Sequence, residues 1–472
     1  MHKYDLLIKG GYLVDPAGNR IGNFDVALSD GRVDRVECEI NPDLAKNIFE
    51  AHEKLVLPGL IDTHVHLTPA LRAVGFKMLA RAGVTCALDC SGLVEDVLEG
   101  LASQGAGISV AVLNRLDPGK TISGPSAPPA ELRDYLDRSL ASGAIGLKLL
   151  GGHLPLSPET TTSAIEIANQ AGAYVAFHCG STLNGSNLNG LLDALAFTGT
   201  QRIHICHVNA YCRGLTHGSP VEETMIALRE LQKRPHIISE SHMATYNSCW
   251  SRLENGLPRS HVTRTCLKSG GFEVSAAGML DAARNGYLRV HKVTENEVLL
   301  AEPEEGVQYL DAVHFDTMVS FPVNRRSTAF LTATQKNSQG RFVVSALSTD
   351  GGGIPRNFLL THGLSLVRFD ALSLSEFVTK CCWTPARMLG LTSKGHLCPG
   401  ADGDLVVVDP ETHRADLTVA GGRPVVINGI VTGSGGTVIT TERGQKSLKN
   451  KGVPIKVTDL SKSLLYHTEE TP

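Results

Sequence analysis

Two histidines one residue apart end an apolar run near the start of the chain. The run reads VLPGLIDTHVHL and spans residues 56–67. Side chains of an extended strand alternate between its faces, so His64 and His66 share one face while Val65 lies on the other. Two neutral imidazoles side by side can supply half the ligands of a metal site. Taken alone, the pair is as compatible with two unrelated histidines, one of them packed in the core, as with a metal site.

Further side chains with metal-binding or proton-transfer chemistry end other short apolar runs. They are Lys148 in AIGLKLL, His178 in YVAFHCG, His207 in RIHICHVN and Asp350 in RFVVSALSTD. Imidazole and carboxylate groups are the usual protein ligands of divalent metals beside cysteine. We therefore ask which fold would bring the ends of these runs to one place.

Short strand-like runs alternate with helical patterns such as those of 131–143 and 220–234, which favours a parallel sheet with right-handed crossovers. Eight such units close a (β/α)8 barrel, whose active site lies at the carboxyl ends of its strands. The sequence therefore predicts an α/β fold with a TIM barrel and a metal site at its mouth. The eight runs are 56–66, 83–91, 107–114, 144–150, 174–180, 202–209, 236–242 and 341–350.

The two ends of the chain share another pattern, in which short apolar runs are separated by Gly, Asn and Asp turns. This pattern predicts a small β-sandwich domain built from residues 1–57 together with 395–440. The barrel then spans 58–394 and carries an insertion around 243–340. The polar, lysine-containing residues 441–472 are expected to be a surface tail or an interface arm.

Charge and composition exclude several classes of protein. The 472 residues include 44 basic and 48 acidic side chains, for a net charge of -4, and no basic stripe predicts binding to nucleic acid. No apolar run is long enough to cross a bilayer, and the first residues do not form a secretory signal. The eleven cysteines have no repeating spacing, which favours a reducing compartment. We expect a cytoplasmic protein without nucleic-acid or membrane partners.

The ordered set PGLIDTHVHL, GLKLL, FHCGS, ICHVN and STDGG resembles the binuclear amidohydrolase superfamily. Dihydroorotases and hydantoinases (dihydropyrimidinases) are one similar branch, and N-acyl-D-amino-acid deacylases are another. The similarity covers nearly the whole chain, including a late stretch that contains TPARMLGL and PGADGDLVVVDP. It implies an enzyme acting on C–N bonds other than peptide bonds, with a small-molecule amide substrate, and it implies a homo-oligomer.

The resemblance implies two divalent metal ions, with zinc expected. His64 and His66 would bind one ion, and His178 and His207 the other. Lys148 would bridge them after reaction with CO2, because an ammonium group has donors only whereas a carbamate has two oxygens that can bind metal. A buried lysine paired with a carboxylate is the alternative for this position.

Asp350 would be both a metal ligand and the catalytic residue. It would take a proton from a hydroxide-forming water that bridges the two metals and pass it to the leaving nitrogen. The expected reaction is hydrolysis of a cyclic amide of the hydantoin or dihydropyrimidine type. Asp350 is followed by three glycines and IPRNF, as in the deacylase branch, whereas GLKLL resembles the hydantoinase branch. Deacylation of an N-acyl-D-amino acid by the same metal core therefore stays open as the alternative, as do a single-metal deaminase and a non-catalytic assembly protein.

Other residues near the strand ends have less certain roles. His153, five residues after Lys148, is a candidate substrate contact or an ordinary loop histidine. Strand alternation predicts that Cys206, next to His207, packs in the barrel wall. Glu240 and His242 share one strand face and would line the pocket or hold a ligand histidine.

Overall fold

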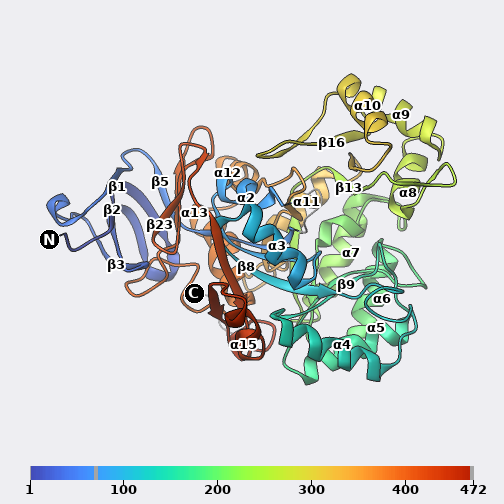
Figure 1. The fold of residues 1–472 in the computed structure, drawn as a ribbon, viewed down its shortest axis with the longest axis horizontal. Coiled ribbons are helices and arrows are strands. Elements are labelled where there is room, and N and C mark those ends of the chain that lie inside the picture. The colour runs from blue at the N-terminus through green and yellow to red at the C-terminus, as the bar shows by residue number, and fades with distance from the viewer. Residues whose placement is uncertain (1, 68–72, 468–472) are drawn as a thin grey trace.

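A computed structural model describes residues 2–67 and 73–467 of the chain. Figure 1 shows a central barrel with helices outside it, a β domain at one end of the molecule and a separate insertion at the other. Residues 6–58 and 405–431 come together in the β domain, although hundreds of residues separate them in the sequence. No helix of the described part is long and apolar enough to cross a membrane.

The barrel is formed by parallel strands, and every one of the eight predicted runs contributes to it. β19 pairs with β12, and β20 pairs with β6, so these two short segments act as one last strand that closes the barrel. The predicted (β/α)8 fold is therefore confirmed. The barrel strands are β6 (Leu60–His66), β7 (Val84–Asp89), β8 (Ala106–Arg115), β9 (Gly146–Leu150), β10 (Tyr174–His178), β11 (His204–Ile205), β12 (Ile238–His242), β19 (Ala346–Ser348) and β20 (Gly351–Gly352).

Helices follow the barrel strands and cover their outer faces. They bury apolar side chains at helical spacing; α4, for example, buries Leu132, Leu136 and Leu140 against the barrel. Ser219 and Glu222 form a capping box that fixes the start of α7. The helices are α2 (Gly75–Arg81), α3 (Val94–Gln104), α4 (Pro129–Ser142), α5 (Pro158–Gln170), α6 (Leu188–Thr198), α7 (Pro220–Gln232), α11 (Arg326–Thr334), α12 (Leu359–Arg368), α13 (Leu374–Val378) and α14 (Thr384–Met388).

Alternation along the barrel strands decides which side chains reach the interior. On β10, Val175 and Phe177 pack outward in the core between strands and helices, whereas Tyr174 and Ala176 pack inside the barrel. The same period of two directs His178, the last residue of β10, inward. The strand pattern thus places a polar ring at the end of an apolar barrel.

The β domain is one nine-stranded sheet to which both chain ends contribute. β5 (Leu55–Pro58) pairs with β21 (Leu405–Asp409) in antiparallel fashion and so joins the two halves. Apolar side chains are buried on both faces of the sheet, because Leu7 lies in one cluster and its neighbours Leu6 and Ile8 lie in another. The other strands are β1 (Leu6–Asp15), β2 (Arg20–Ser29), β3 (Arg32–Glu37), β4 (Ile48–Glu50), β22 (Arg414–Ala420), β23 (Arg423–Ile427) and β24 (Ile430–Val431).

The C-terminal segment differs from the predicted boundary of the β domain and from the predicted tail. β25 (Gly435–Thr440) pairs with β8 of the barrel, β26 (Ile455–Val457) pairs with β25, and α15 (Glu442–Asn450) packs against α4. β8 pairs with β9 only from Leu113 onward, so its first half would otherwise present an open edge. Burial of that edge is the physical reason for the difference. Residues 468–472 of the predicted tail lie outside the described residues.

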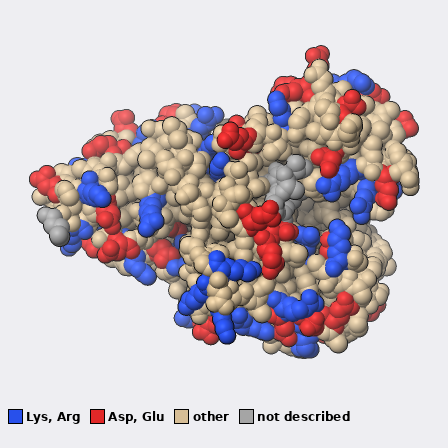
Figure 2. All heavy atoms as spheres, viewed as in Figure 1, with Lys and Arg blue, Asp and Glu red and all other residues tan. Residues whose placement is uncertain are grey.

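The segment between β12 and α11 forms a unit with its own apolar core. An antiparallel sheet contains β13 (Asn247–Trp250), β18 (Met318–Phe321), β16 (Arg289–Val293) and β17 (Val298–Leu300), in that order. Met279, Leu310 and Phe321 are among the buried residues of its core. In Figure 2, basic and acidic side chains are interspersed on the outer surface of this unit that faces the viewer. The remaining elements are β14 (Leu253–Glu254), β15 (Leu257–Pro258), α8 (His261–Ser269), α9 (Ala276–Arg284) and α10 (Pro303–Ala312).

Candidate metal centre

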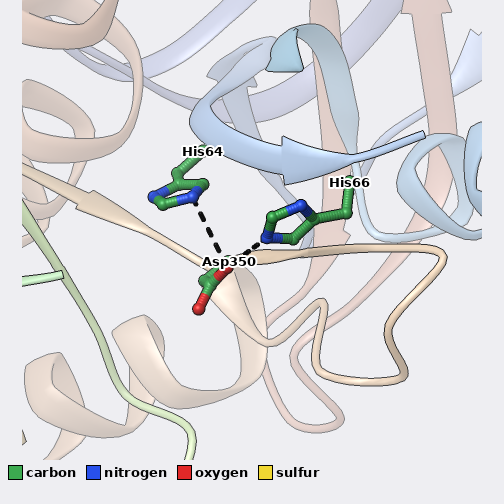
Figure 3. Close-up of side chains that lie close together, drawn as sticks. All are labelled: His64, His66 and Asp350. Carbon is green, nitrogen blue, oxygen red and sulfur yellow. Dashed lines mark hydrogen bonds and ion pairs between the residues drawn. The ribbon is translucent and has the colours of Figure 1, made fainter. Parts of the chain in front are cut away.

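His64, His66 and Asp350 form a compact group at the mouth of the barrel (Figure 3). The Nε2 atom of His66 lies 2.6 Å from Oδ1 of Asp350, and Nε2 of His64 lies 3.5 Å from the same oxygen. Two imidazole nitrogens therefore converge on one carboxylate oxygen from a neighbouring barrel strand. This is a donor set suited to a divalent metal.

His178 and His207 form a second converging pair. Nδ1 of His178 lies 3.0 Å from Nε2 of His207, and Nε2 of His178 lies 2.9 Å from Oγ of Ser186. A hydrogen bond to Ser186 leaves the lone pair of the other His178 nitrogen facing His207. Nδ1 of His207 is buried and has no hydrogen-bond partner among the described residues. The pair thus offers two ring nitrogens directed at one point.

Glu240 connects the two pairs from the inner face of β12. Its Oε1 atom lies 2.7 Å from Nδ1 of His64 and accepts a hydrogen bond of 2.7 Å from the backbone N–H of His207, while Ser348 donates to the other oxygen. A carboxylate on one ring nitrogen fixes the tautomer of a histidine and leaves the other nitrogen free to bind metal. Of the two sequence interpretations for Glu240, the structure supports the partner of a ligand histidine.

Lys148 lies below the histidines on β9 and is fully buried. Its Nζ atom lies 2.6 Å from Sγ of Cys206, and no carboxylate forms an ion pair with it among the described residues. The alternative of a lysine paired with a carboxylate is therefore not what the structure contains. Burial raises the pKa of the Cys206 thiol to about 12, so Cys206 is a neutral neighbour.

The prediction that Cys206 packs in the barrel wall is wrong. Cys206 faces the barrel interior with Leu113, Ala176 and Ile238. His207 follows it with φ of 33° and ψ of 59°, a left-handed conformation that interrupts the strand alternation. Both consecutive side chains can therefore reach the interior, which a regular strand does not allow.

Asp350 also sits in a left-handed backbone conformation, with φ of 51°, between β19 and β20. Its Oδ2 forms an ion pair with Arg356, and Nε of Arg356 donates to the backbone carbonyl of Asp350 at 2.6 Å. Burial alone would raise the pKa of this carboxyl, but the charge of Arg356 and the hydrogen bond with His66 hold it well below its usual range. Asp350 is thus an ionised carboxylate. Sequence reasoning assigned no role to Arg356, although it lies in the IPRNF stretch.

The histidines predicted as metal ligands are neutral for a physical reason. Burial, and then the charge of Lys148, hold the pKa of His64 well below its usual range, and burial has the same effect on His178 and His207. A neutral imidazole keeps the lone pair that a metal needs. The group of His64, His66 and Asp350 therefore fits a divalent ion, and His178 and His207 offer two further neutral nitrogens nearby.

Two further histidines lie at the rim of this centre. The ring of His153 meets that of His178 edge to face at 5.1 Å between centroids. His242, at the end of β12, lies 6.4 Å from the ring of His207, and burial lowers its pKa to about 3. The structure therefore brings all the predicted ligand and substrate-contact positions into one region, while their roles stay predictions.

A model of the amidohydrolase family matches residues 55–438. A dihydroorotase from Pelotomaculum thermopropionicum is 25% identical over 441 residues, which covers 86% of this chain and 89% of that protein. A dihydroorotase from Anaeromyxobacter dehalogenans is 27% identical over 426 residues, with coverage of 86% and 88%.

Solved structures resemble the fold over most of its length. An N-acyl-D-glutamate deacylase from Bordetella bronchiseptica, complexed with zinc and a phosphonate inhibitor, has a TM-score of 0.65 at 16% identity and covers 93% of this chain and 99% of its own. A dihydropyrimidinase from Brevibacillus agri has a TM-score of 0.58 at 17% identity, with coverage of 92% and 97%. At such identities the likeness establishes the fold alone.

Proposed function

The chain belongs to the amidohydrolase family, and we propose that it hydrolyses the C–N bond of a cyclic amide of the hydantoin or dihydropyrimidine type, using two divalent metal ions. One observation carries this proposal. His64 and His66 converge on Asp350, His178 and His207 converge on each other, and a buried Lys148 without an ion pair lies beneath them.

His64, His66 and Asp350 would hold one ion, and His178 and His207 the other, with zinc expected because imidazole and carboxylate suit it. Ions bound there would polarise an amide carbonyl and lower the pKa of a water molecule. Lys148 would lie between the two groups. As an ammonium it has no acceptor, but after addition of CO2 its carbamate would offer one oxygen to each side.

Asp350 is proposed to accept a proton from the attacking water and deliver it to the departing nitrogen. The Arg356 ion pair keeps the carboxylate ionised, so it starts the cycle as the proton acceptor. A carboxylic acid with a low pKa then releases its proton readily, and an amine leaves poorly without that proton. One side chain thus serves as base and then as acid.

Deacylation of an N-acyl-D-amino acid by the same metal core is the second candidate. It rests on the resemblance of the stretch after Asp350, because the buried guanidinium of Arg356 already donates to the backbone carbonyls of Asp350 and Tyr246 and pairs with the Asp350 carboxylate. The glycines at 351–353, which follow Asp350, support the same candidate by resemblance.

We also propose that the enzyme is a cytoplasmic homo-oligomer that acts on a small-molecule amide. All eleven cysteines are free thiols in the structure, as a reducing compartment would require.

A substrate panel tests the proposal. Protein loaded with zinc in bicarbonate would be incubated with hydantoins, dihydrouracil, dihydroorotate and N-acetyl and N-formyl D-amino acids, and metal content would be measured in parallel. Turnover of a cyclic amide with two metals per chain is the expected result. Turnover of the N-acyl amino acids alone would support the deacylase, and a metal-loaded protein inert to the whole panel would contradict both.

A further inference from the structure

His242 has no part in the metal groups, yet it lies beside them. It is the last residue of β12, two residues after Glu240, and therefore on the same strand face. Its partner in register on β19 is Ser348, two residues before Asp350. His242 is buried, with 1% of its surface exposed, and its ring centroid lies 6.4 Å from that of His207.

Hydrogen bonds fix the ring and its tautomer. The backbone N–H of Ala244 donates to Nδ1 of His242 at 3.2 Å, and Nδ2 of Asn209 lies 3.5 Å from the same nitrogen. Oδ1 of Asn209 accepts the backbone N–H of His242 at 3.0 Å. Because Nδ1 accepts, the proton of the neutral ring is on Nε2.

The Nε2–H group of His242 donates no hydrogen bond to any described residue of the protein. Nε2 is buried and has no hydrogen-bond partner among the described residues. Buried polar groups are nearly always hydrogen-bonded, so an oriented donor without an acceptor indicates a group reserved for a ligand. The charged groups near His242 include the cation Arg356 and the carboxylate Asp350.

We propose that Nε2–H of His242 donates a hydrogen bond to the carbonyl oxygen of the scissile amide as that oxygen gains negative charge. This inference rests on the proposed amide hydrolysis. The proton stays on His242 throughout, so the residue forms no bond to substrate and acts only as a fixed donor. A preorganised neutral donor stabilises developing charge without having to reorient during the reaction.

Two variants of this residue and one control test the inference. His242→Leu removes the donor, and His242→Gln replaces it with an amide N–H. His236→Gln is the matched control, because His236 precedes the same strand at the opposite end of the barrel. Metal content, kcat and KM on the best substrate, and the affinities for a phosphonate analogue of the tetrahedral state and for the product would be measured.

We expect His242→Leu to keep its metals and its KM but to lose about 10²–10³-fold in kcat, as after removal of one oxyanion donor. The phosphonate should bind more weakly by a similar factor, while product affinity stays nearly unchanged. His242→Gln should recover part of both losses, and His236→Gln should equal the wild type.

A His242→Leu enzyme with wild-type kcat would overturn the inference while leaving the proposed function intact. Loss of metal in both His242 variants, or equal losses of phosphonate and product affinity, would also overturn it, because these results indicate a structural role. If the wild type turned over nothing in the panel, the proposed function would fail. The donor role would then be tested by binding alone, and it would be rejected if wild type and His242→Leu bound the phosphonate with equal affinity.

Discussion

At the scale of single residues, the centre depends on side chains whose partners fix their chemical state. Glu240 holds the Nδ1 proton of His64, and Ser186 contacts Nε2 of His178, so each ring keeps its second nitrogen available. Arg356 holds Asp350 in its ionised form. These partners prepare the donor atoms before any metal arrives.

Asp350→Asn should retain the histidine ligands but lose about 10²–10⁴-fold in kcat, because an amide neither accepts nor delivers the proton. Since the charge of Arg356 and the hydrogen bond with His66 hold the pKa of Asp350 well below its usual range, the wild-type rate should not fall at mildly acidic pH through this group. The measurements are kcat of Asp350→Asn and the wild-type rate as a function of pH, each with the metal content determined in parallel. Full activity in a metal-loaded variant would refute the proposed role.

Lys148→Ala should lose metal and activity together, since the proposed carbamate supplies an oxygen to each ion. A short-chain carboxylate added to the buffer should restore part of the activity by occupying the vacated space. Lys120→Ala, at an exposed lysine, is the control and should equal the wild type. A single-metal deaminase would instead keep both metal and activity without Lys148, and that outcome would exclude the bridged centre.

At the scale of secondary-structure elements, β25 completes the barrel where β8 and β9 diverge. Its Thr437 and Ile439 lie in register with Ser109 and Ala111 of β8, more than three hundred residues earlier in the chain. Ile439 belongs to the apolar cluster inside the barrel. The C-terminal segment is therefore part of the scaffold that supports the strands of the metal centre.

Ile439→Ala should lower the free energy of unfolding by about 2–5 kcal/mol, the range for truncating a buried isoleucine. Ile430→Ala, at a side chain that is 68% exposed, should change it by less than about 0.5 kcal/mol. Urea unfolding of both variants provides the measurement. Equal stability of the two variants would show that β25 contributes little to the barrel.

At the scale of the whole molecule, burial of ionisable groups links stability to pH. Burial lowers the pKa of His204 and of His242 to about 3, whereas an unfolded histidine titrates near ~6.5. Between these values the unfolded chain binds more protons than the folded one, so the stability contributed by each neutral histidine is lost as pH falls. Asp62, whose pKa burial raises to about 7, acts in the opposite direction.

The metal-free protein should therefore be less stable at a pH of about 5 than at about 7.5, because the buried histidines with lowered pKa values outnumber the acids with raised ones. Each such histidine contributes a slope of about 1.4 kcal/mol per pH unit within its window. Urea unfolding of the chelated protein at both pH values gives the comparison. Greater stability at the lower pH would contradict this account.

The sequence alone determined the features that follow a local period. Alternation on β6 directs His64 and His66 to one face, and eight apolar runs separated by helical patterns specify a barrel whose strand ends meet. Tertiary structure decided whatever depends on a break in that period or on contact between distant segments. His207 and Asp350 reach the centre from left-handed backbone conformations, so His207 can lie on the same side as the inward-facing Cys206 and the argument from alternation fails there. The pairing of β25 with β8 and the link from Glu240 to two histidines join residues far apart in the chain, and such contacts depend on packing that no local pattern encodes.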